Sequence, residues 1–182
     1  RGFTRESIEK YSIGYSLNSW DFVYTFLTKR GFDSKLLHSA GIIVVREDDD
    51  KHFDRFRNRI MFPIKNHQGE VIAFSGRALG NDEPKYLNSP ETPIFNKSKL
   101  FFNYYQARSS IRKNEQAVLF EGFADTISAA EAGVENGLAT MGTSLTDDHI
   151  QILKRNCNEV VVCFDADKAG VEAANRAADM LY

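Results

Sequence analysis

The clearest signal in this sequence is Val118-Leu-Phe-Glu121-Gly122, an apolar run that ends in an acid and a glycine. A second run, Val161-Val-Cys-Phe-Asp165-Ala-Asp167, also ends in acids. Short apolar runs bounded by polar or turn-forming residues are typical of buried strands. We therefore predict that both runs are strands of one sheet and that their acids lie where the strands end.

The residues around these runs alternate between strand and helix patterns. The predicted order is a strand at 117–120, a helix at 124–132, a strand at 137–141, a helix after the N-cap Thr146, a strand at 160–164 and a helix at 170–181. Three successive β-α units predict parallel strands, right-handed crossovers and helices on the faces of the sheet.

The first 99 residues show a different pattern. Thr4, Ser19 and Asp33 are expected to cap three short helices. Residues 59–64 and 71–75 are expected to form a β-hairpin, and residues 80–99 a long ordered loop. We predict an α/β protein, with a mixed α/β N-terminal subdomain at 1–99 and a parallel β-α-β-α-β-α subdomain at 100–182.

Composition excludes several classes of protein. The 182 residues are 42% hydrophobic and 12% aromatic, which indicates a folded chain. The longest apolar stretches have the length of strands, so no membrane span or secretory signal is expected. Cys157 and Cys163 have no metal-binding spacing, and we expect reduced, buried thiols and a cytoplasmic location. Because the sequence begins with Arg1, we expect a fragment of a longer protein.

Acids at the two strand ends indicate a metal site. Chemistry in parallel α/β sheets gathers at the carboxyl ends of the strands, where we expect Glu121, Asp165 and Asp167, with Asp125 one helical turn after Glu121. Converging carboxylates repel one another without a cation, and Mg²⁺ prefers such oxygen ligands together with substrate phosphates. The alternative at this point is ordinary turn chemistry.

A basic segment precedes the acidic part of the chain. Residues 51–99 carry nine Lys or Arg against five Asp or Glu, whereas residues 100–182 carry seven against twelve. If extended, Arg55, Arg57 and Arg59 place their guanidinium groups on one side, either as a nucleic-acid stripe or as a solvated edge. The aromatic residues at 101–105 are expected in the core rather than stacked on bases, and His52, His67 and His149 on the surface.

Two groups of motifs resemble known families. Glu121-Gly-Phe-Ala-Asp125 followed by Asp165-Ala-Asp167-Lys-Ala-Gly170 resembles the Toprim module of topoisomerases, primases and some nucleases. The segments Arg55-Phe-Arg-Asn-Arg59-Ile-Met-Phe-Pro-Ile64, Ser75-Gly-Arg77 and Pro84-Lys85-Tyr-Leu-Asn88-Ser-Pro-Glu-Thr92 are similar to the catalytic domain of bacterial DnaG-type primases. The resemblance extends over essentially the whole chain.

This resemblance implies a nucleotidyltransferase that synthesises short RNA primers on single-stranded DNA during replication. It implies Mg²⁺ or Mn²⁺ as cofactor, and ribonucleoside triphosphates and a template strand as partners. It assigns metal binding to Glu121, Asp165 and Asp167, with Asp125 as an auxiliary acid. Lys85 is implied in catalysis, as a point charge for a triphosphate or template. The residues implied in nucleotide or DNA binding are Arg1, Arg55, Arg57, Arg77, Lys85 and Asn88.

Parts of the family pattern are not found in this sequence. We find no counterpart of three features of the family: a zinc-binding N-terminal domain, a helicase-binding C-terminal domain and a further downstream acidic pair. We therefore expect bound zinc and contact with the replicative helicase only in a longer protein. Two alternatives remain open. One is a Toprim-type nuclease or topoisomerase fragment, and the other is a non-catalytic nucleotide- or single-strand-binding module.

Overall fold

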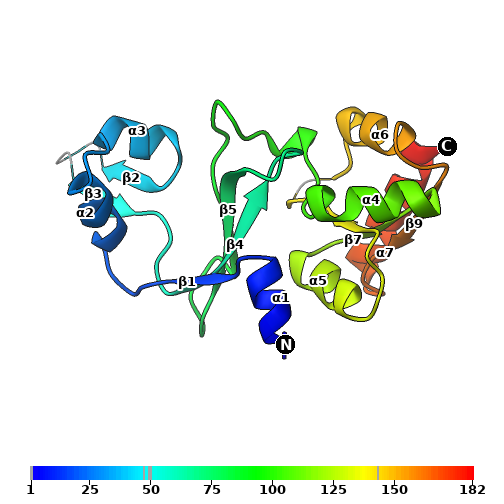
Figure 1. The fold of residues 1–182 in the computed structure, drawn as a ribbon, viewed down its shortest axis with the longest axis horizontal. Coiled ribbons are helices and arrows are strands. Elements are labelled where there is room, and N and C mark those ends of the chain that lie inside the picture. The colour runs from blue at the N-terminus through cyan, green and yellow to red at the C-terminus, as the bar shows by residue number, and fades with distance from the viewer. Residues whose placement is uncertain (1, 47, 49–50, 143) are drawn as a thin grey trace. The chain divides into compact units, whose positions relative to one another are not determined.

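The computed structural model describes residues 2–46, 48, 51–142 and 144–182. Arg1, to which the resemblance assigned DNA binding, lies outside these ranges. The described residues form two compact units (Figure 1). Unit 1 comprises described residues within 1–64 and 71–95, and unit 2 comprises those within 65–70 and 96–182.

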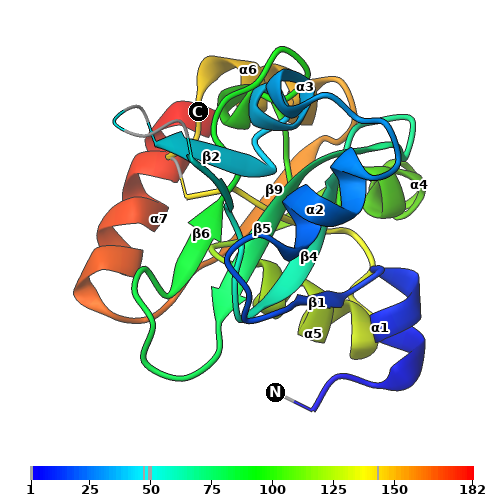
Figure 2. The ribbon, with the colours of Figure 1, turned by 90° about the vertical axis from the view of Figure 1, so that its left-hand side faces the viewer.

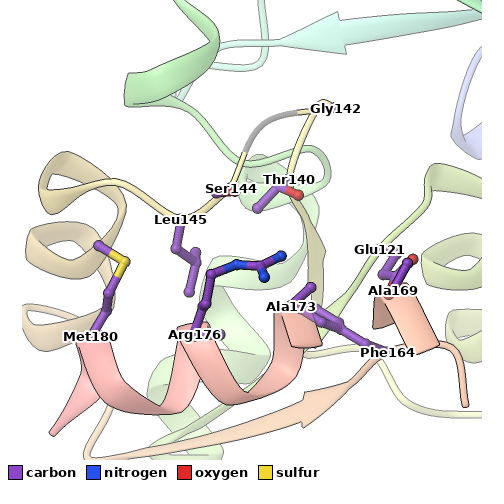
Figure 3. Close-up of a pocket in the computed structure, with 11 residues that line it drawn as sticks. Glu121, Thr140, Gly142, Ser144, Leu145, Phe164, Ala169, Ala173, Arg176 and Met180 are labelled. Carbon is purple, nitrogen blue, oxygen red and sulfur yellow. The ribbon is translucent and has the colours of Figure 1, made fainter. Parts of the chain in front are cut away.

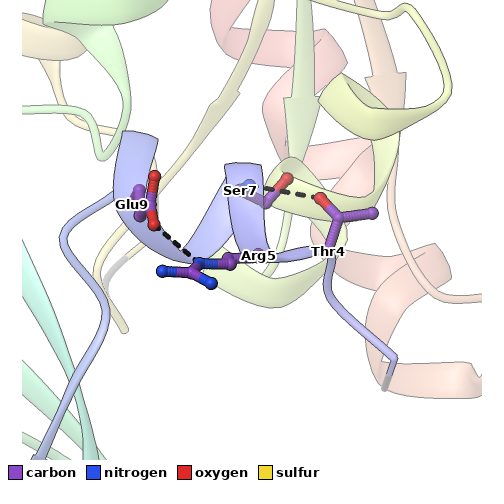
Figure 4. A network of polar contacts seen from close by, with 4 residues as sticks. All are labelled: Thr4, Arg5, Ser7 and Glu9. Atoms are coloured by element: carbon purple, nitrogen blue, oxygen red, sulfur yellow. Dashed lines mark hydrogen bonds and ion pairs between the residues drawn. The ribbon is translucent and has the colours of Figure 1, made fainter.

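Unit 1 begins with three short helices, α1 (Arg5–Lys10), α2 (Phe22–Thr28) and α3 (Ser34–Ser39). The predicted cap of α1 is confirmed, because Thr4 Oγ1 accepts a hydrogen bond from the Ser7 backbone N–H at 3.2 Å (Figure 4). Arg5 Nε also lies 3.0 Å from Glu9 Oε1 across one exposed turn (Figure 4). Exposed pairs stabilise a fold little, so the cap is the stronger local determinant of α1.

The strands of unit 1 form two antiparallel sheets, of which the larger has the order β1-β4-β5-β6 and the smaller pairs β2 with β3. In Figure 2, β4 and β5 run side by side as neighbouring arrows, which confirms the predicted hairpin. The turn is closed by the Asn66 N–H, which donates to the Glu70 carbonyl at 2.9 Å. The strands are β1 (Gly14–Ser16), β2 (Ile43–Arg46), β3 (Lys51–Asp54), β4 (Arg59–Lys65), β5 (Val71–Ala78) and β6 (Tyr86–Asn88).

The loop predicted at residues 80–99 is interrupted by regular structure. Strand β6 pairs with β5, with Ser75 opposite Asn88 and Arg77 opposite Tyr86. A single turn of 3₁₀ helix, η1 (Lys97–Lys99), follows. A strand of three residues has no detectable alternation, and the surrounding turn formers concealed it in the sequence.

The cap predicted for α2 is wrong, because Asp54 at the end of β3 takes the place expected of Ser19. The Asp54 carboxylate accepts hydrogen bonds from the Val23 N–H at 2.7 Å and from the Tyr24 N–H at 2.9 Å. Asp54 is 2% exposed, whereas the N-cap residue Asp21 makes no side-chain cap bond. The helix is therefore capped from a residue distant in sequence, which local spacing does not reveal.

Replacing Asp54 with alanine is expected to lower the free energy of unfolding by about 2 kcal/mol, because two charge-assisted hydrogen bonds to the first turn of α2 are lost. Urea denaturation measures this loss. The matched control is Asp21→Ala, which removes an exposed acid from the same helix start and is expected to change stability by less than about 0.5 kcal/mol. Equal losses in the two variants would contradict the remote cap.

Unit 2 contains the predicted parallel sheet, with strand order β8-β7-β9. The predicted alternation of strands and helices is confirmed. Its elements are β7 (Gln116–Phe120), α5 (Phe123–Glu131), β8 (Gly137–Ala139), α6 (Asp147–Lys154), β9 (Glu159–Cys163) and α7 (Lys168–Leu181). The connection from β7 to β8 through α5 runs in one direction along the sheet, and the connection from β8 to β9 through α6 runs back past β7 in the other direction. Because both crossovers are expected to be right-handed, α5 and α6 lie on opposite faces of the sheet.

The core of unit 2 includes a helix that the sequence did not reveal, α4 (Tyr104–Asn114). Phe101 and Phe102 precede it and are buried, as predicted, whereas Tyr105, also expected in the core, is 37% exposed. Asn103, in the left-handed region at φ +70°, turns the chain into α4, and its Nδ2 donates to the Gly137 carbonyl at 2.9 Å. One core cluster joins α4, α6, α7 and the sheet; its members include Ala107, Ile111, Leu119, Leu138, Ile150, Leu153 and Ala177.

His149 was expected on the surface but is fully buried on α6. Its Nδ1 accepts a hydrogen bond from the Thr146 N–H at 3.2 Å, so Nε2 carries the proton and donates to the Leu100 carbonyl at 2.9 Å. Burial lowers the pKa of His149, although the hydrogen bond to Leu100 and the nearby Asp148 act in the opposite direction. The histidine therefore joins α6 to the segment before α4 in its neutral form.

This arrangement predicts a pH-dependent stability. Below the unfolded-state pKa of about 6.5, the unfolded chain takes up a proton that the folded ring resists, so the stability present above that pH is lost as the pH falls towards the lowered folded-state pKa. Urea denaturation from about pH 8 to pH 5.5 should show a steeper loss in the wild type than in His149→Gln. His38→Gln, at an exposed position of α3, is the control; a parallel pH profile for His149→Gln would contradict the prediction.

Within the described ranges, no helix is long and apolar enough to cross a membrane. Both cysteines are free, as expected. Cys157 is half-buried, but Cys163 is exposed, which corrects the expected burial. The side chains of β9 alternate between half-buried and exposed, and Cys163 belongs to the exposed set.

Candidate metal and nucleic-acid site

Two of the predicted acids meet at the carboxyl end of the parallel sheet. Glu121 follows β7 and Asp165 lies just beyond β9, and the two strands are in register with Phe120 opposite Cys163. Glu121 Oε1 accepts a hydrogen bond from the Asp165 backbone N–H at 3.3 Å. Both residues are exposed, so their carboxylate oxygens are accessible to a ligand from solvent.

The other two acids begin the helices that follow the same strands. Asp167 caps α7, and its Oδ1 accepts a hydrogen bond from the Gly170 N–H at 2.8 Å. Asp125 lies in the first turn of α5. Among the described residues, no three His, Cys, Asp or Glu side chains are arranged to share one metal ion. The structure therefore places all four acids at one end of the sheet and brings Glu121 and Asp165 together, while their roles as ligands stay predictions.

Gly170 allows the chain to approach the strand end closely. A Cβ at this position would lie 2.1 Å from the Asp165 carbonyl oxygen and 2.8 Å from Glu121 Oε1. Both distances are shorter than any normal contact, and the first is to a backbone atom, which can move only if its whole segment shifts. Glycine is therefore required for α7 to begin against Asp165 while the Glu121 carboxylate keeps its position.

These donors fit a divalent magnesium-type cation. Mg²⁺ takes hard oxygen ligands, commonly one or two protein carboxylates together with substrate phosphates and water. Glu121 and Asp165 supply exposed carboxylates after two neighbouring strands, and Asp167 and Asp125 add two more at the helix starts that follow. When bound, such an ion supplies neutralisation of phosphoryl charge.

Glu121 also lines a cavity of about 380 Å³ in unit 2 (Figure 3). Arg176 extends from α7 into this cavity, and Thr140 and Ser144 line it with hydroxyl groups (Figure 3). Sequence reasoning missed Arg176; the available signal was an arginine in a helix otherwise rich in alanine. A cation, two hydroxyls and an acid around one cavity can bind a phosphorylated ligand.

Arg55 and Arg57 line one cavity of about 360 Å³ in unit 1, together with Arg59 and the acids Asp82 and Glu83. The Arg55 guanidinium donates to the Asn88 carbonyl at 3.0 Å, and burial lowers its pKa. Arg57 donates to the Asp54 carbonyl and lies over the Trp20 ring at 4.3 Å. Backbone and aromatic contacts thus hold both guanidinium groups in place.

The extended arrangement considered for Arg55, Arg57 and Arg59 is not present. Strand β4 begins only at Arg59, and Asn58 before it has a φ of +51°, which is incompatible with an extended chain. Arg59 is 5% exposed and donates to the carbonyls of Gly76 at 3.1 Å and Pro84 at 2.8 Å. Its guanidinium therefore joins β5 to the segment before β6.

The β5–β6 pairing places Arg77 opposite Tyr86 and Asn88 opposite Ser75, and Lys85 immediately precedes β6. The Ala78 N–H donates to the Lys85 carbonyl at 2.9 Å, and Arg77 is one residue earlier on the same strand. The Lys85 side chain is exposed. Arg77 Nε is buried without a hydrogen-bond partner, which is costly unless a ligand accepts from it.

Trp20 is a candidate binding residue that sequence reasoning missed. The single tryptophan of the sequence is 63% exposed, and its ring packs edge-on against Phe53 at 5.5 Å. With Arg55 and Arg57 it lines a cavity of about 500 Å³. Exposed aromatic rings beside arginines are the combination with which proteins stack bases of single-stranded nucleic acid.

Both units of the chain match known protein families. Residues 118–182 match a family model described as Toprim-like, which agrees with the parallel sheet and its strand-end acids. The fold and the site therefore define a Toprim-containing protein. Residues 1–108, more than half of the chain, match the model described as the N-terminal domain of the DNA primase catalytic core, and the chain belongs to this family.

Individual relatives agree with this assignment. The chain is 53% identical over 181 residues to a DNA primase of Halalkalibacterium halodurans, covering all of this chain and 30% of the relative. A DNA primase domain from Pseudomonas aeruginosa is 40% identical with a TM-score of 0.92, over 99% of this chain and 56% of that one. A DnaG primase catalytic domain bound to ssDNA is 41% identical with a TM-score of 0.87, over 98% and 56%. The chain thus spans about a third of the curated relative.

Proposed function

We propose that this chain is part of the catalytic core of a DNA primase, a DNA-directed RNA polymerase that makes short RNA primers on single-stranded DNA. The observation that carries the proposal is the meeting of Glu121 and Asp165 at the end of the parallel sheet, in a chain of the primase family. Relatives over the whole chain are named DNA primase, which supports this reaction over the alternatives.

In this proposal, unit 2 holds the metal and the incoming nucleotide. Glu121, Asp165 and Asp167 hold Mg²⁺ or Mn²⁺, with Asp125 as an auxiliary acid. The family's Toprim-like part supports divalent metal in general, and the exposed carboxylates support an oxygen-binding cation. Arg176 faces the cavity beside Glu121 and is placed to bind the triphosphate.

Unit 1 binds the single-stranded template. Arg55, Arg57 and Arg77 bind phosphates with guanidinium groups, and Lys85 adds a point charge. Trp20 stacks on a base. A related catalytic domain is known bound to ssDNA, which supports a single strand as partner.

The Trp20→Ala variant is expected to bind a labelled oligodeoxythymidine about tenfold more weakly, because stacking of one base on an aromatic ring contributes about 1–3 kcal/mol. Fluorescence anisotropy measures the affinity. Phe32→Ala removes another exposed aromatic ring of unit 1 and is the matched control, with no change expected. If both variants bind like the wild type, Trp20 has no part in strand binding.

The proposed reaction is tested by the product. The protein is incubated with a single-stranded DNA template, labelled ribonucleoside triphosphates and Mg²⁺ or Mn²⁺, and the label is followed on a denaturing gel. We expect short, alkali-labile RNA and an intact template. Fragmentation of the template without RNA would favour the nuclease alternative, and nucleotide binding without any product would favour the non-catalytic module.

A further inference from the structure

Unit 2 also contains a basic cavity whose charged residues have no part in the proposals above. It has a volume of about 440 Å³ and lies between α4, the end of α6 and the turn after β4. Five of the described residues that line it are cationic and none is acidic; the cations are Lys65, Lys99, Arg108, Arg112 and Arg155. We name these five residues, with Tyr104, the α4 groove.

Two arginines of the α4 groove are held in position by hydrogen bonds. Arg108 Nη1 donates to the His67 carbonyl at 2.8 Å, and Arg112 Nε donates to Asn156 Oδ1 at 3.0 Å. Asn156 is itself fixed, because its Nδ2 donates to the Ile152 carbonyl at 2.7 Å. These contacts go to neutral oxygens, so they orient the guanidinium groups and leave their charge uncompensated.

The arrangement of these groups favours a chain of phosphates over a single one. Tyr104, Arg108 and Arg112 follow one another at intervals of four residues, so they share one face of α4 over about 12 Å. Arg155 and Lys99 extend the positive charge to neighbouring elements. Tyr104, half-buried at one end, offers an aromatic ring beside the cations.

We infer that the α4 groove binds the sugar-phosphate backbone of a single-stranded nucleic acid. Clustered cations that share one cavity repel one another, and a polyanion removes this repulsion while releasing its own counterions. This inference rests on the proposed function, because the reaction offers two single strands that the groove could bind, the DNA template and the RNA product. The α4 groove shares no residue with the strand-end acids or with the arginine-lined cavities of unit 1, so it would be an additional contact region.

The test measures the binding of labelled oligodeoxythymidine and oligouridine to the whole chain by fluorescence anisotropy at several salt concentrations. The Arg108→Ala/Arg112→Ala variant is expected to bind about 25-fold more weakly at 0.1 M salt. The slope of log affinity against log salt should fall in magnitude by about 1.4, since each single-strand phosphate contact contributes about 0.7. The oligomer with the larger loss identifies the strand as template or product.

Two further variants make the result specific. Lys99→Ala/Arg155→Ala removes two groove cations and leaves the hydrogen bonds of Arg108 and Arg112 in place, and the same loss is expected. Lys113→Ala/Lys154→Ala removes two exposed lysines from α4 and α6 outside the groove, and affinity should stay within about twofold. Urea denaturation of each variant checks that the fold is retained.

Several results would overturn the inference. Equal losses in the groove variants and the lysine control would show a general charge effect. Groove variants that bind oligonucleotides normally but lose affinity for a nucleoside triphosphate would assign the groove to free nucleotide. If the groove variants bind normally while Trp20→Ala is weakened, the groove inference fails and the proposed function stands. If the wild type binds no strand at all, both fail.

Discussion

RNA synthesis by Glu121→Gln is expected to be at least about 100-fold slower than by the wild type. Glutamine has nearly the same shape, and its Oε1 can still accept the hydrogen bond from the Asp165 N–H. The fold is therefore expected to persist while the negative charge that attracts a divalent cation is removed. Metal catalysis contributes several kcal/mol to such reactions, and each 1.4 kcal/mol is a factor of ten in rate. Asp165→Asn is expected to cause a similar loss.

The rate is measured by incorporation of labelled ribonucleotides on a single-stranded template. Glu172→Gln and Asp179→Asn are matched controls, because they make the same chemical changes at exposed positions of α7 beyond its first turn. Both controls should retain the wild-type rate. A Glu121→Gln variant that synthesises RNA as fast as its control would show that Glu121 has no catalytic role.

The second large effect is expected for Gly170→Ala. The new methyl group would lie 2.1 Å from the Asp165 carbonyl oxygen, so either α7 or the segment after β9 must move. We expect the free energy of unfolding to fall by about 3 kcal/mol, at the upper end of overpacking effects. RNA synthesis should fall further than stability explains, because the same methyl group also displaces the Glu121 carboxylate, 2.8 Å away.

Urea denaturation and the incorporation assay, run on the same preparations, separate these two effects. Gly14→Ala is the control, since nothing lies within 4 Å of its Cβ position and its φ is ordinary. It should leave both the stability and the rate nearly unchanged. A stable and active Gly170→Ala variant would show that the approach of α7 to the strand end does not position the acids.

The parallel half of the fold could be predicted because its signals are local. Each strand of unit 2 is an apolar run with a clear end, and Thr146 and Asp167 cap the helices that follow. The features that sequence reasoning missed depend on tertiary contacts. Asp54 caps a helix some thirty residues earlier in the chain, and β6 is a strand only because β5 pairs with it.

Helix α4 and His149 were missed for a related reason. The α4 segment has few apolar residues, and its helical face is defined by the buried Ala107 and Ile111 against the sheet. His149 was expected on the surface, yet its ring bonds to the Leu100 carbonyl in the core. In both cases the decisive partner is distant in sequence.

The candidate site was predictable in its acids more than in its basic residues. The position of Glu121 and Asp165 follows from where two strands end, which the sequence marks. The burial of Arg59 beside the half-buried Arg55 and Arg57 depends on the backbone turn at Asn58, and the position of Trp20 depends on its packing against Phe53. Neither is encoded in a local pattern.

The most direct test of the strand-end metal site is a titration of the protein with Mn²⁺, followed by the electron paramagnetic resonance signal of the free ion. We predict that the wild type depletes this signal and that Glu121→Gln binds the ion at least about tenfold more weakly, while Glu172→Gln binds like the wild type. Equal Mn²⁺ affinity in the wild type and Glu121→Gln would contradict a metal site at Glu121 and Asp165.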